Sequence, residues 1–176
     1  MTMPTTERTL MLLRHAKAEQ VEGKPDHDRE LAPRGRSDAR AVGQWLSHPS
    51  QPVFDLVLCS TSERTRQTLD GLAAGGARFK ETLFDERIYD AGAASLLDVL
   101  RGVPDSVNTL LMIGHAPGIP VLATALVAES AEPTSGNDLL FNGFPTAGLA
   151  ILGFDGGWAA LAPETAQLRD FVVRRG

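Results

Sequence analysis

The stretch TLMLLRH, residues 9–15, decides the fold of this chain, because it is a nearly unbroken apolar run that ends in an arginine and a histidine. Two later stretches, FDLVLCST (54–61) and TLLMIGH (109–115), have the same design. Short apolar runs without polar alternation are typical of strands that are covered on both faces in a parallel sheet. We therefore predict three buried strands, each ending in side chains that can take part in chemistry.

Helical patterns lie between and after these strands. Residues 33–49 repeat apolar side chains at three- and four-residue steps until Pro49 stops the pattern. Residues 61–76 open with Thr and Ser, which cap helices well, and end in two glycines. Residues 93–104 and 119–129 give two further helices. Strands that alternate with helices favour a three-layer α/β/α fold with a mostly parallel central sheet.

The last third of the chain departs from this alternation. Residues 129–138 are polar and contain Ser, Pro, Gly and Asn, which predicts a loop. The apolar stretches 146–154 and 158–163 predict a closing hairpin that turns around residues 155–157. A length of 176 residues suits one domain, so we expect residues 1–176 to form a single unit.

The composition excludes several classes of protein. Hydrophobic residues make up 43% of the chain and charged residues 22%, values near the averages of globular domains. The 17 basic and 22 acidic residues give a net charge of −5, which argues against a nucleic-acid partner. Cys59 is the only cysteine, so an internal disulfide is excluded and a buried structural thiol is expected. Because no apolar stretch suits a signal peptide or a membrane span, we expect a cytoplasmic protein that binds no membrane.

The polar ends of the three predicted strands suggest where a ligand binds. In open α/β sheets, ligands bind beyond the carboxyl ends of the strands. That edge would receive Arg14 and His15 from the first strand, residues 60–66 from the second, and His115 from the third. Several guanidinium groups and two imidazoles repel one another unless an anion lies among them. Arginine can hold two phosphate oxygens at once, and a neutral imidazole can act as a nucleophile. The pattern therefore predicts a site for phosphate or a similarly compact oxyanion.

The same segments resemble the motifs of a known family. LRHA (13–16), STSERTRQT (60–68) and GH (114–115) are similar, in that order and at comparable spacing, to the motifs of the histidine phosphatase superfamily. The small size of the chain, together with DRELAPRGR (28–36) and FPT (144–146), is most similar to its short SixA-type branch of phosphohistidine phosphatases. The resemblance covers nearly the whole chain and implies a phosphoglycerate mutase-like fold.

The resemblance also implies a role for individual residues. His15 corresponds to the nucleophile that receives the phosphoryl group and forms a phosphohistidine, which water then hydrolyses. Arg14, Arg64 and His115 correspond to the groups that bind the phosphoryl oxygens, and Ala116 adds to this phosphate-binding set. The resemblance implies that the reaction requires no metal and no other cofactor.

Two positions need separate comment. The usual Arg-His-Gly motif is Arg-His-Ala here, so Ala16 places a methyl group after the nucleophile and is expected to tighten the turn. Glu86 resembles the general acid of ester-cleaving relatives, but a glutamate at this position is equally compatible with a solvated surface charge. An alkoxide leaving group needs a proton in the transition state, whereas a phosphoramidate nitrogen accepts one readily. Loss of Glu86 should therefore impair ester hydrolysis more than cleavage of a P–N bond.

Other basic side chains of this region are expected outside the phosphate site. Arg66 follows Arg64 by two residues, so on a helix their side chains point about 200° apart and only one faces the phosphate. We expect that one to be Arg64 and place Arg66 at the surface or behind the site. Arg34 is expected on a solvated helix face, and His48 at a helix end is expected to act as a cap.

Alternative chemistries fit the sequence less well. A cysteine phosphatase needs five residues between its cysteine and arginine, but the intervals from Cys59 are four to Arg64 and six to Arg66. The three consecutive side chains of residues 26–28 do not converge on one metal ion in a helix or strand, so a polar loop is preferred there. No GxxxxGK[ST] or GxGxxG motif is present. A catalytically silent phosphate-binding module is left as an option from another class, because a fold does not fix activity.

The substrate is the least determined part of the prediction. We expect a phosphohistidine on a signalling or phosphotransfer protein, because no long lid segment is evident between residues 86 and 108. The composition of residues 129–142, with Ser, Gly, Asn and Asp, allows a mobile lid. A lid would close the pocket over a small substrate, so the alternative substrate is a sugar phosphate or another small phosphate ester.

Overall fold

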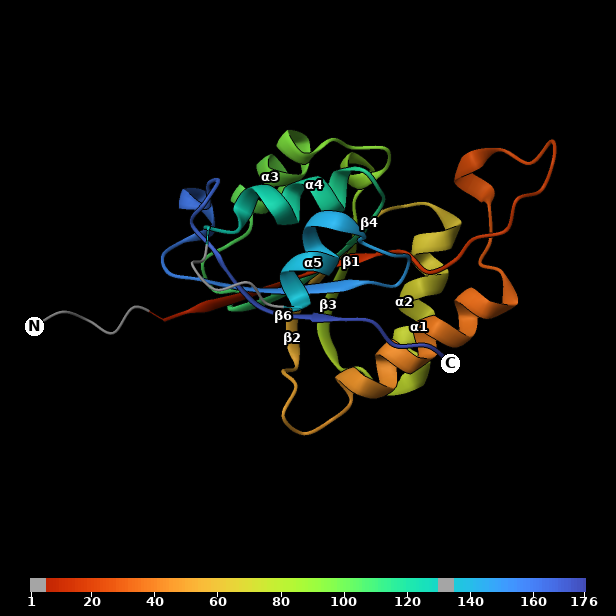
Figure 1. Ribbon diagram of the computed structural model, residues 1–176, viewed down its shortest axis with the longest axis horizontal. Helices are drawn as coiled ribbons and strands as arrows, with labels where there is room; N and C mark the ends of the chain where they lie inside the picture. Colours follow the sequence, from red (N-terminus) through yellow and green to blue (C-terminus); the bar gives the residue numbers. More distant parts are fainter. Residues whose placement is uncertain (1–5, 130–134) are drawn as a thin grey trace, which may run out of the picture.

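The computed structural model describes residues 6–129 and 135–176, and its centre is one six-stranded sheet (Figure 1). The strands are β1 (Arg8–Arg14), β2 (Phe54–Cys59), β3 (Phe79–Phe84), β4 (Thr109–Gly114), β5 (Leu149–Phe154) and β6 (Gln167–Val172). Their order across the sheet is β3-β2-β4-β1-β5-β6. The first four in this order run parallel, while β5 and β6 are antiparallel to their neighbours. The predicted α/β fold with a mostly parallel sheet is confirmed.

Alternation along the buried strands explains the three layers. Successive side chains of a strand point to opposite faces, so an unbroken apolar run supplies two cores at once. Leu10 and Leu12 of β1 belong to one core, whereas Met11 and Leu13 belong to the other. The first core is covered by α3 (Ala93–Arg101), α4 (Gly118–Leu126) and α5 (Ser135–Asn142), and the second by α1 (Pro33–Leu46) and α2 (Glu63–Gly75), as Figure 1 shows.

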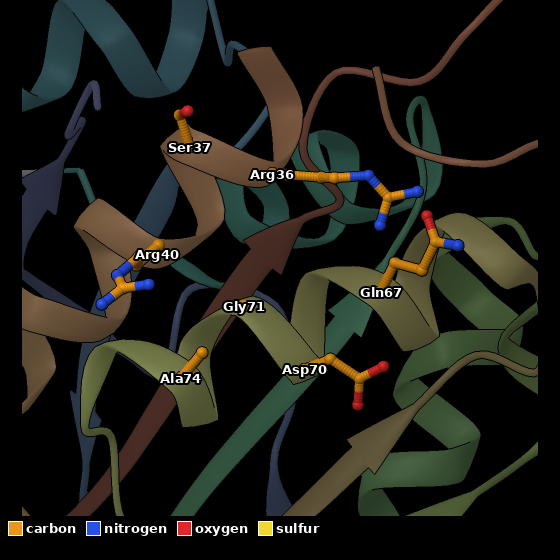
Figure 2. Close-up of a pocket in the computed structure, with 7 residues that line it drawn as sticks. All are labelled: Arg36, Ser37, Arg40, Gln67, Asp70, Gly71 and Ala74. Carbon is orange, nitrogen blue, oxygen red and sulfur yellow. The ribbon is translucent and has the colours of Figure 1, made fainter. Parts of the chain in front are cut away.

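Glycines allow α1 and α2 to approach each other closely. A Cβ at Gly43 would collide with the Leu72 backbone, and one at Gly75 would collide with the Arg40 carbonyl. The outer surface of this helix pair carries a hollow of about 370 Å³ (Figure 2), lined by Arg36, Ser37, Arg40, Gln67, Asp70, Gly71 and Ala74. None of the residues predicted to bind phosphate belongs to this lining.

Three predictions about the elements were wrong or incomplete. Strand β3 was not predicted, because this edge strand is largely exposed and has no continuous apolar run. The closing hairpin pairs β5 with β6, whereas residues 158–160 form a short 3₁₀ helix that buries Trp158. The loop predicted at 129–138 lies partly outside the described residues, and its last part, from Ser135, is the start of α5.

In the residues that the structure describes, no helix is long and apolar enough to cross a membrane.

Candidate active site

Strand register brings the predicted site residues together. In the parallel pair of β1 and β4, Arg14 lies opposite Gly114, so His15 and His115 follow side by side at the carboxyl edge. The His15 amide donates to the Gly114 carbonyl at 3.0 Å, and the two imidazole centroids are 5.3 Å apart. On the other side of β4, the Ser60 amide donates to the Ile113 carbonyl at 3.1 Å. Adjacent parallel strands therefore deliver three chemically capable ends to one place.

The His15 ring is held in a single tautomer. Its Nδ1 lies 2.8 Å from the Ala16 carbonyl oxygen. A carbonyl oxygen can only accept, so Nδ1 carries the proton and Nε2 keeps its lone pair. Burial lowers the pKa of His15 to about 4, and the positive charges of Arg64 and Arg14 act in the same direction. At neutral pH the ring is therefore uncharged and nucleophilic at Nε2.

His115 lies deeper and is held by a serine. Its Nε2 and the Ser60 Oγ are 2.8 Å apart, and both residues are buried. Burial first, and then the neighbouring His15 and Arg64, lower the pKa of His115 to about 3. The sequence did not predict Ser60 as a partner of His115. The register of β2 against β4, which brings the two residues together, cannot be read from the sequence.

The two arginines reach the site with part of each guanidinium already bonded. Arg14 donates from Nη1 to the Phe144 carbonyl at 2.9 Å. Arg64 donates from Nη1 to the Asp26 carbonyl at 2.7 Å and from Nη2 to the Asp26 carboxylate at 3.0 Å. Burial lowers the pKa of Arg14, although an arginine stays charged at neutral pH.

Three nitrogens of these side chains lack a protein partner. Arg14 Nε, Arg64 Nε and His115 Nδ1 are buried and form no hydrogen bond within the described residues. A buried polar group left unpaired costs about 1–3 kcal/mol, and more where the group is charged. An oxyanion among them would satisfy the two guanidinium donors and balance their charge. This arrangement fits the predicted phosphate ligand.

Asp26 and Tyr89 also lie at the site, although the sequence patterns predicted no role for them in binding phosphate. Asp26 begins a short 3₁₀ turn, η1 (Asp26–Asp28), in the loop between β1 and α1. Its carboxylate accepts from the Tyr89 hydroxyl at 2.7 Å and from Arg29 at 3.0 Å, besides Arg64. The hydrogen bond from Tyr89, followed by those from the two arginines, holds the pKa of Asp26 well below its usual range. The Tyr89 ring packs edge-on against His115 with centroids 5.5 Å apart.

The structure explains how Ala16 is accommodated after the nucleophile. Its side chain is fully buried and packs in the core beneath α1 and α2. Its amide donates to the Thr68 Oγ1 at 3.0 Å, and that hydroxyl donates to the Arg64 carbonyl at 2.7 Å. Thr68 therefore ties the segment after His15 to the helix that carries Arg64.

The remaining predicted residues lie farther from these contacts. Glu86 is exposed at the start of a 3₁₀ turn, η2 (Glu86–Ile88), and its side chain forms no hydrogen bond or ion pair in the described part of the chain. Arg66 stacks on the Phe84 ring, 4.0 Å from its centroid. Arg34 is exposed and lies 3.7 Å from Asp38. Ala116 is exposed directly after His115, and no acceptor for its amide is found within residues 6–129 and 135–176.

The structure also bears on the two alternative chemistries, a cysteine nucleophile at Cys59 and a metal site at residues 26–28. Cys59 is fully buried, and burial raises the pKa of its thiol to about 12, which is unsuited to a thiolate nucleophile. Residues 26–28 form the η1 turn, and the described residues contain no group of three or more His, Cys, Asp or Glu side chains arranged to hold a metal ion.

Comparisons with known proteins show the family of this chain. The sequence model of the histidine phosphatase superfamily (branch 1) matches residues 10–91. An uncharacterized protein of Mycobacterium tuberculosis strain H37Rv is 40% identical over 93% of this chain and 100% of its own. The structure of a protein of Nakamurella multipartitia, described as a candidate phosphohistidine phosphatase SixA, shares 37% identity with a TM-score of 0.83 and covers 97% of this chain and 98% of its own. The structure of a protein of Agrobacterium tumefaciens with the same description shares 28% identity with a TM-score of 0.74. It covers 94% of this chain and 97% of its own. The chain therefore belongs to the histidine phosphatase superfamily, in its SixA-type branch, and is a phosphatase.

Proposed function

We propose that this phosphatase removes the phosphoryl group from a phosphohistidine side chain of another protein and that His15 is its nucleophile. The observation that carries the proposal is the His15 Nε2 lone pair, which the Ala16 carbonyl fixes beside the buried Nε–H groups of Arg14 and Arg64, neither of which has a partner among residues 6–129 and 135–176. A neutral nucleophile next to guanidinium groups with an available N–H donor suits phosphoryl transfer, because charge builds on the phosphoryl oxygens.

The first step transfers the phosphoryl group to the enzyme. Nε2 of His15 attacks phosphorus, a new P–N bond forms, and the P–N bond of the substrate breaks. Its electron pair stays on the leaving imidazole nitrogen, which takes up a proton from solvent. Arg14, Arg64, His115 and the amide of Ala116 bind the oxygens, and the Ala16 carbonyl stabilises the positive charge that develops on the His15 ring.

The second step regenerates the enzyme. Water attacks the phosphorus of the phosphorylated His15, the P–N bond to Nε2 breaks, and inorganic phosphate leaves. No change of oxidation state occurs, and the proton released by water leaves with phosphate and solvent. The phosphoryl pocket serves both steps because the charge distribution of the two transition states is similar.

The choice of a P–N substrate rests on the leaving group. Glu86 is exposed, and its side chain forms no hydrogen bond or ion pair within the described residues, so it is not fixed in place as an acid for an alkoxide. The descriptions of the Nakamurella and Agrobacterium relatives as candidate phosphohistidine phosphatases support the same choice. A small phosphate ester is the second candidate, because Glu86 resembles the general acid of ester-cleaving relatives and begins the η2 turn that leads to Tyr89, whose ring packs against His115.

Comparison of substrates in the wild type and in Glu86→Gln tests this proposal. The measurement is kcat/KM for a phosphohistidine-bearing phosphotransfer protein and for a panel of sugar phosphates and other small esters. We expect the protein substrate to be preferred and its turnover to be nearly unchanged in Glu86→Gln. Glu81→Gln, at an exposed position of β3, is the matched control.

Preference for an ester, together with a loss of about 10²-fold or more in Glu86→Gln but not in Glu81→Gln, would contradict the assignment of the substrate. That result would make Glu86 the general acid of an esterase that uses the same nucleophile.

A further inference from the structure

The contacts of Asp26 single it out among the residues around the site. Arg64 is buried, with 8% of its side chain exposed, whereas the Asp26 side chain is 54% exposed. The exposed residue nevertheless supplies both acceptors that the buried guanidinium uses, a backbone carbonyl and a carboxylate oxygen. In Figure 1 the loop that carries Asp26 projects beyond the sheet next to the start of α2. The backbone carbonyl and the carboxylate of one loop residue therefore hold both Nη atoms of a buried cation.

The geometry leaves one part of the Arg64 guanidinium available to a ligand. Nη1 and Nη2 both donate to Asp26, while Nε is buried and has no partner within the described residues. A guanidinium is planar, so fixing its two Nη atoms also fixes the direction of the Nε–H bond. Asp26 thus presents Nε as a donor with a set direction.

Asp26 is itself held from three sides. Tyr89 donates to the same carboxylate oxygen as Arg64, and Arg29 donates to the other one at 3.0 Å. Tyr89 also packs against His115, so the carboxylate connects Arg64 to the second histidine of the site. Such fixed donors stabilise a transition state only when their positions are accurate, and a displacement of about 1 Å can cost about 10²-fold in rate.

We propose that Asp26 is a positioning residue for phosphoryl transfer, which orients the Arg64 guanidinium toward the phosphoryl oxygens. This inference rests on the proposed function for its kinetic consequences, but the orientation of Arg64 exists without turnover. An opposite role is conceivable for the same contact, in which the carboxylate occupies the place of the phosphoryl group and must be displaced. The two roles differ in sign, because loss of a positioning residue slows the reaction whereas loss of a competing anion accelerates it.

The first experiment observes the Arg64 guanidinium directly by NMR of ¹⁵N-labelled protein. The Nε–H signal of Arg64 is assigned from its loss in Arg64→Lys, and inorganic phosphate is the probe. We expect a sharp signal that phosphate shifts in the wild type, and a signal broadened by exchange without a comparable shift in Asp26→Ala. Asp28→Ala is the matched control, because Asp28 belongs to the same turn and its carboxylate lies 3.7 Å from the His27 ring without a side-chain hydrogen bond in the described part of the chain. An unchanged Arg64 signal and phosphate response in Asp26→Ala would overturn the proposal, whether or not the protein is a phosphohistidine phosphatase.

The second experiment is a kinetic cycle with phosphoramidate as a P–N donor. Asp26→Ala should lower kcat/KM by about 10²-fold, while Asp28→Ala leaves it unchanged. In the Arg64→Ala background, Asp26→Ala should have no further effect, because Asp26 acts through Arg64. A full further loss in that background, or a rise in kcat/KM with tighter phosphate binding, would overturn the proposal. Asp26→Asn, which keeps one acceptor oxygen and the backbone carbonyl, should lose less activity and serves the same cycle if Asp26→Ala is unstable.

Discussion

At the scale of single residues, the site depends on charges that burial and neighbours control. The sequence predicted that Arg14, His15 and His115 converge, because the ends of parallel strands share an edge. It did not predict Asp26 or Ser60 as their partners. Neither residue stands in a pattern that shows its contact: Asp26 reaches Arg64 across 38 positions, and Ser60 reaches His115 across 55. Such contacts are set by loop conformation and strand register, which local sequence patterns do not encode.

The lowered pKa of His15 predicts a specific pH dependence of stability. Its pKa is about 4 in the folded protein and near 6.5 in the unfolded chain, so the unfolded state binds more protons between these values. The contribution to stability is therefore complete above about pH 6.5 and is lost as the pH falls toward 4. In His15→Asn the free energy of unfolding, measured with urea, should fall less between pH 7 and pH 5 than in the wild type.

The matched control is His48→Asn, which changes an exposed histidine at the end of α1. Its pH profile should follow that of the wild type. If His15→Asn also followed the wild-type profile, a neutral, buried His15 would be refuted.

At the scale of elements, α2 connects the packing of the helix layer to the phosphate site. Arg64 lies in the first turn of α2, where Ser62 caps the helix and Thr68 ties it to the segment after His15. The sequence predicted α2 from its cap and glycines and β1, β2 and β4 from their apolar runs. It missed β3 and misplaced the partner of β5, because an exposed edge strand and a long hairpin connection carry no strong periodic signal.

Substitution of Gly43 by alanine tests the close contact of α1 with α2. The new Cβ would meet backbone atoms of Leu72, which cannot move away as a flexible side chain does. We expect a loss of about 1–3 kcal/mol in the free energy of unfolding, seen as a lower urea midpoint. Gly143→Ala is the control, because a Cβ there meets no atom of the described residues within 4 Å. Equal stability of the two variants would show that the helices adjust without cost.

At the scale of the whole molecule, contacts between distant parts of the chain close the fold. Asp38 of α1 is only 1% exposed and accepts from Arg175 and from the Gly176 amide, both at 3.1 Å. These hydrogen bonds hold the segment after β6 against α1, which covers the core that also contains Ala16, the residue after His15. The three-layer architecture was predictable from alternating elements, but a bond across 137 positions was not, because nothing in either segment specifies the other.

Removal of the Asp38 carboxylate should therefore destabilise the protein as a whole. Asp38→Ala removes a buried carboxylate to which Arg175 and the Gly176 amide donate, and we expect a loss of about 1–3 kcal/mol in the free energy of unfolding, measured by heat or urea. Asp98→Ala is the comparison, since it removes an exposed carboxylate that is 3.7 Å from Arg101. A surface ion pair of that kind contributes about 0–1 kcal/mol. A loss no larger in Asp38→Ala than in Asp98→Ala would show that the contact does not hold the chain end.

The central claim is that His15 carries the phosphoryl group, and trapping of the phosphoenzyme tests it most directly. The protein is mixed with a ³²P-labelled phosphohistidine donor, quenched in alkali within the first turnover, and the labelled peptide is identified by mass spectrometry. We predict an acid-labile, alkali-stable label on His15 that is absent from His15→Asn. Turnover without a label on His15, or a label that persists in His15→Asn, would contradict the account.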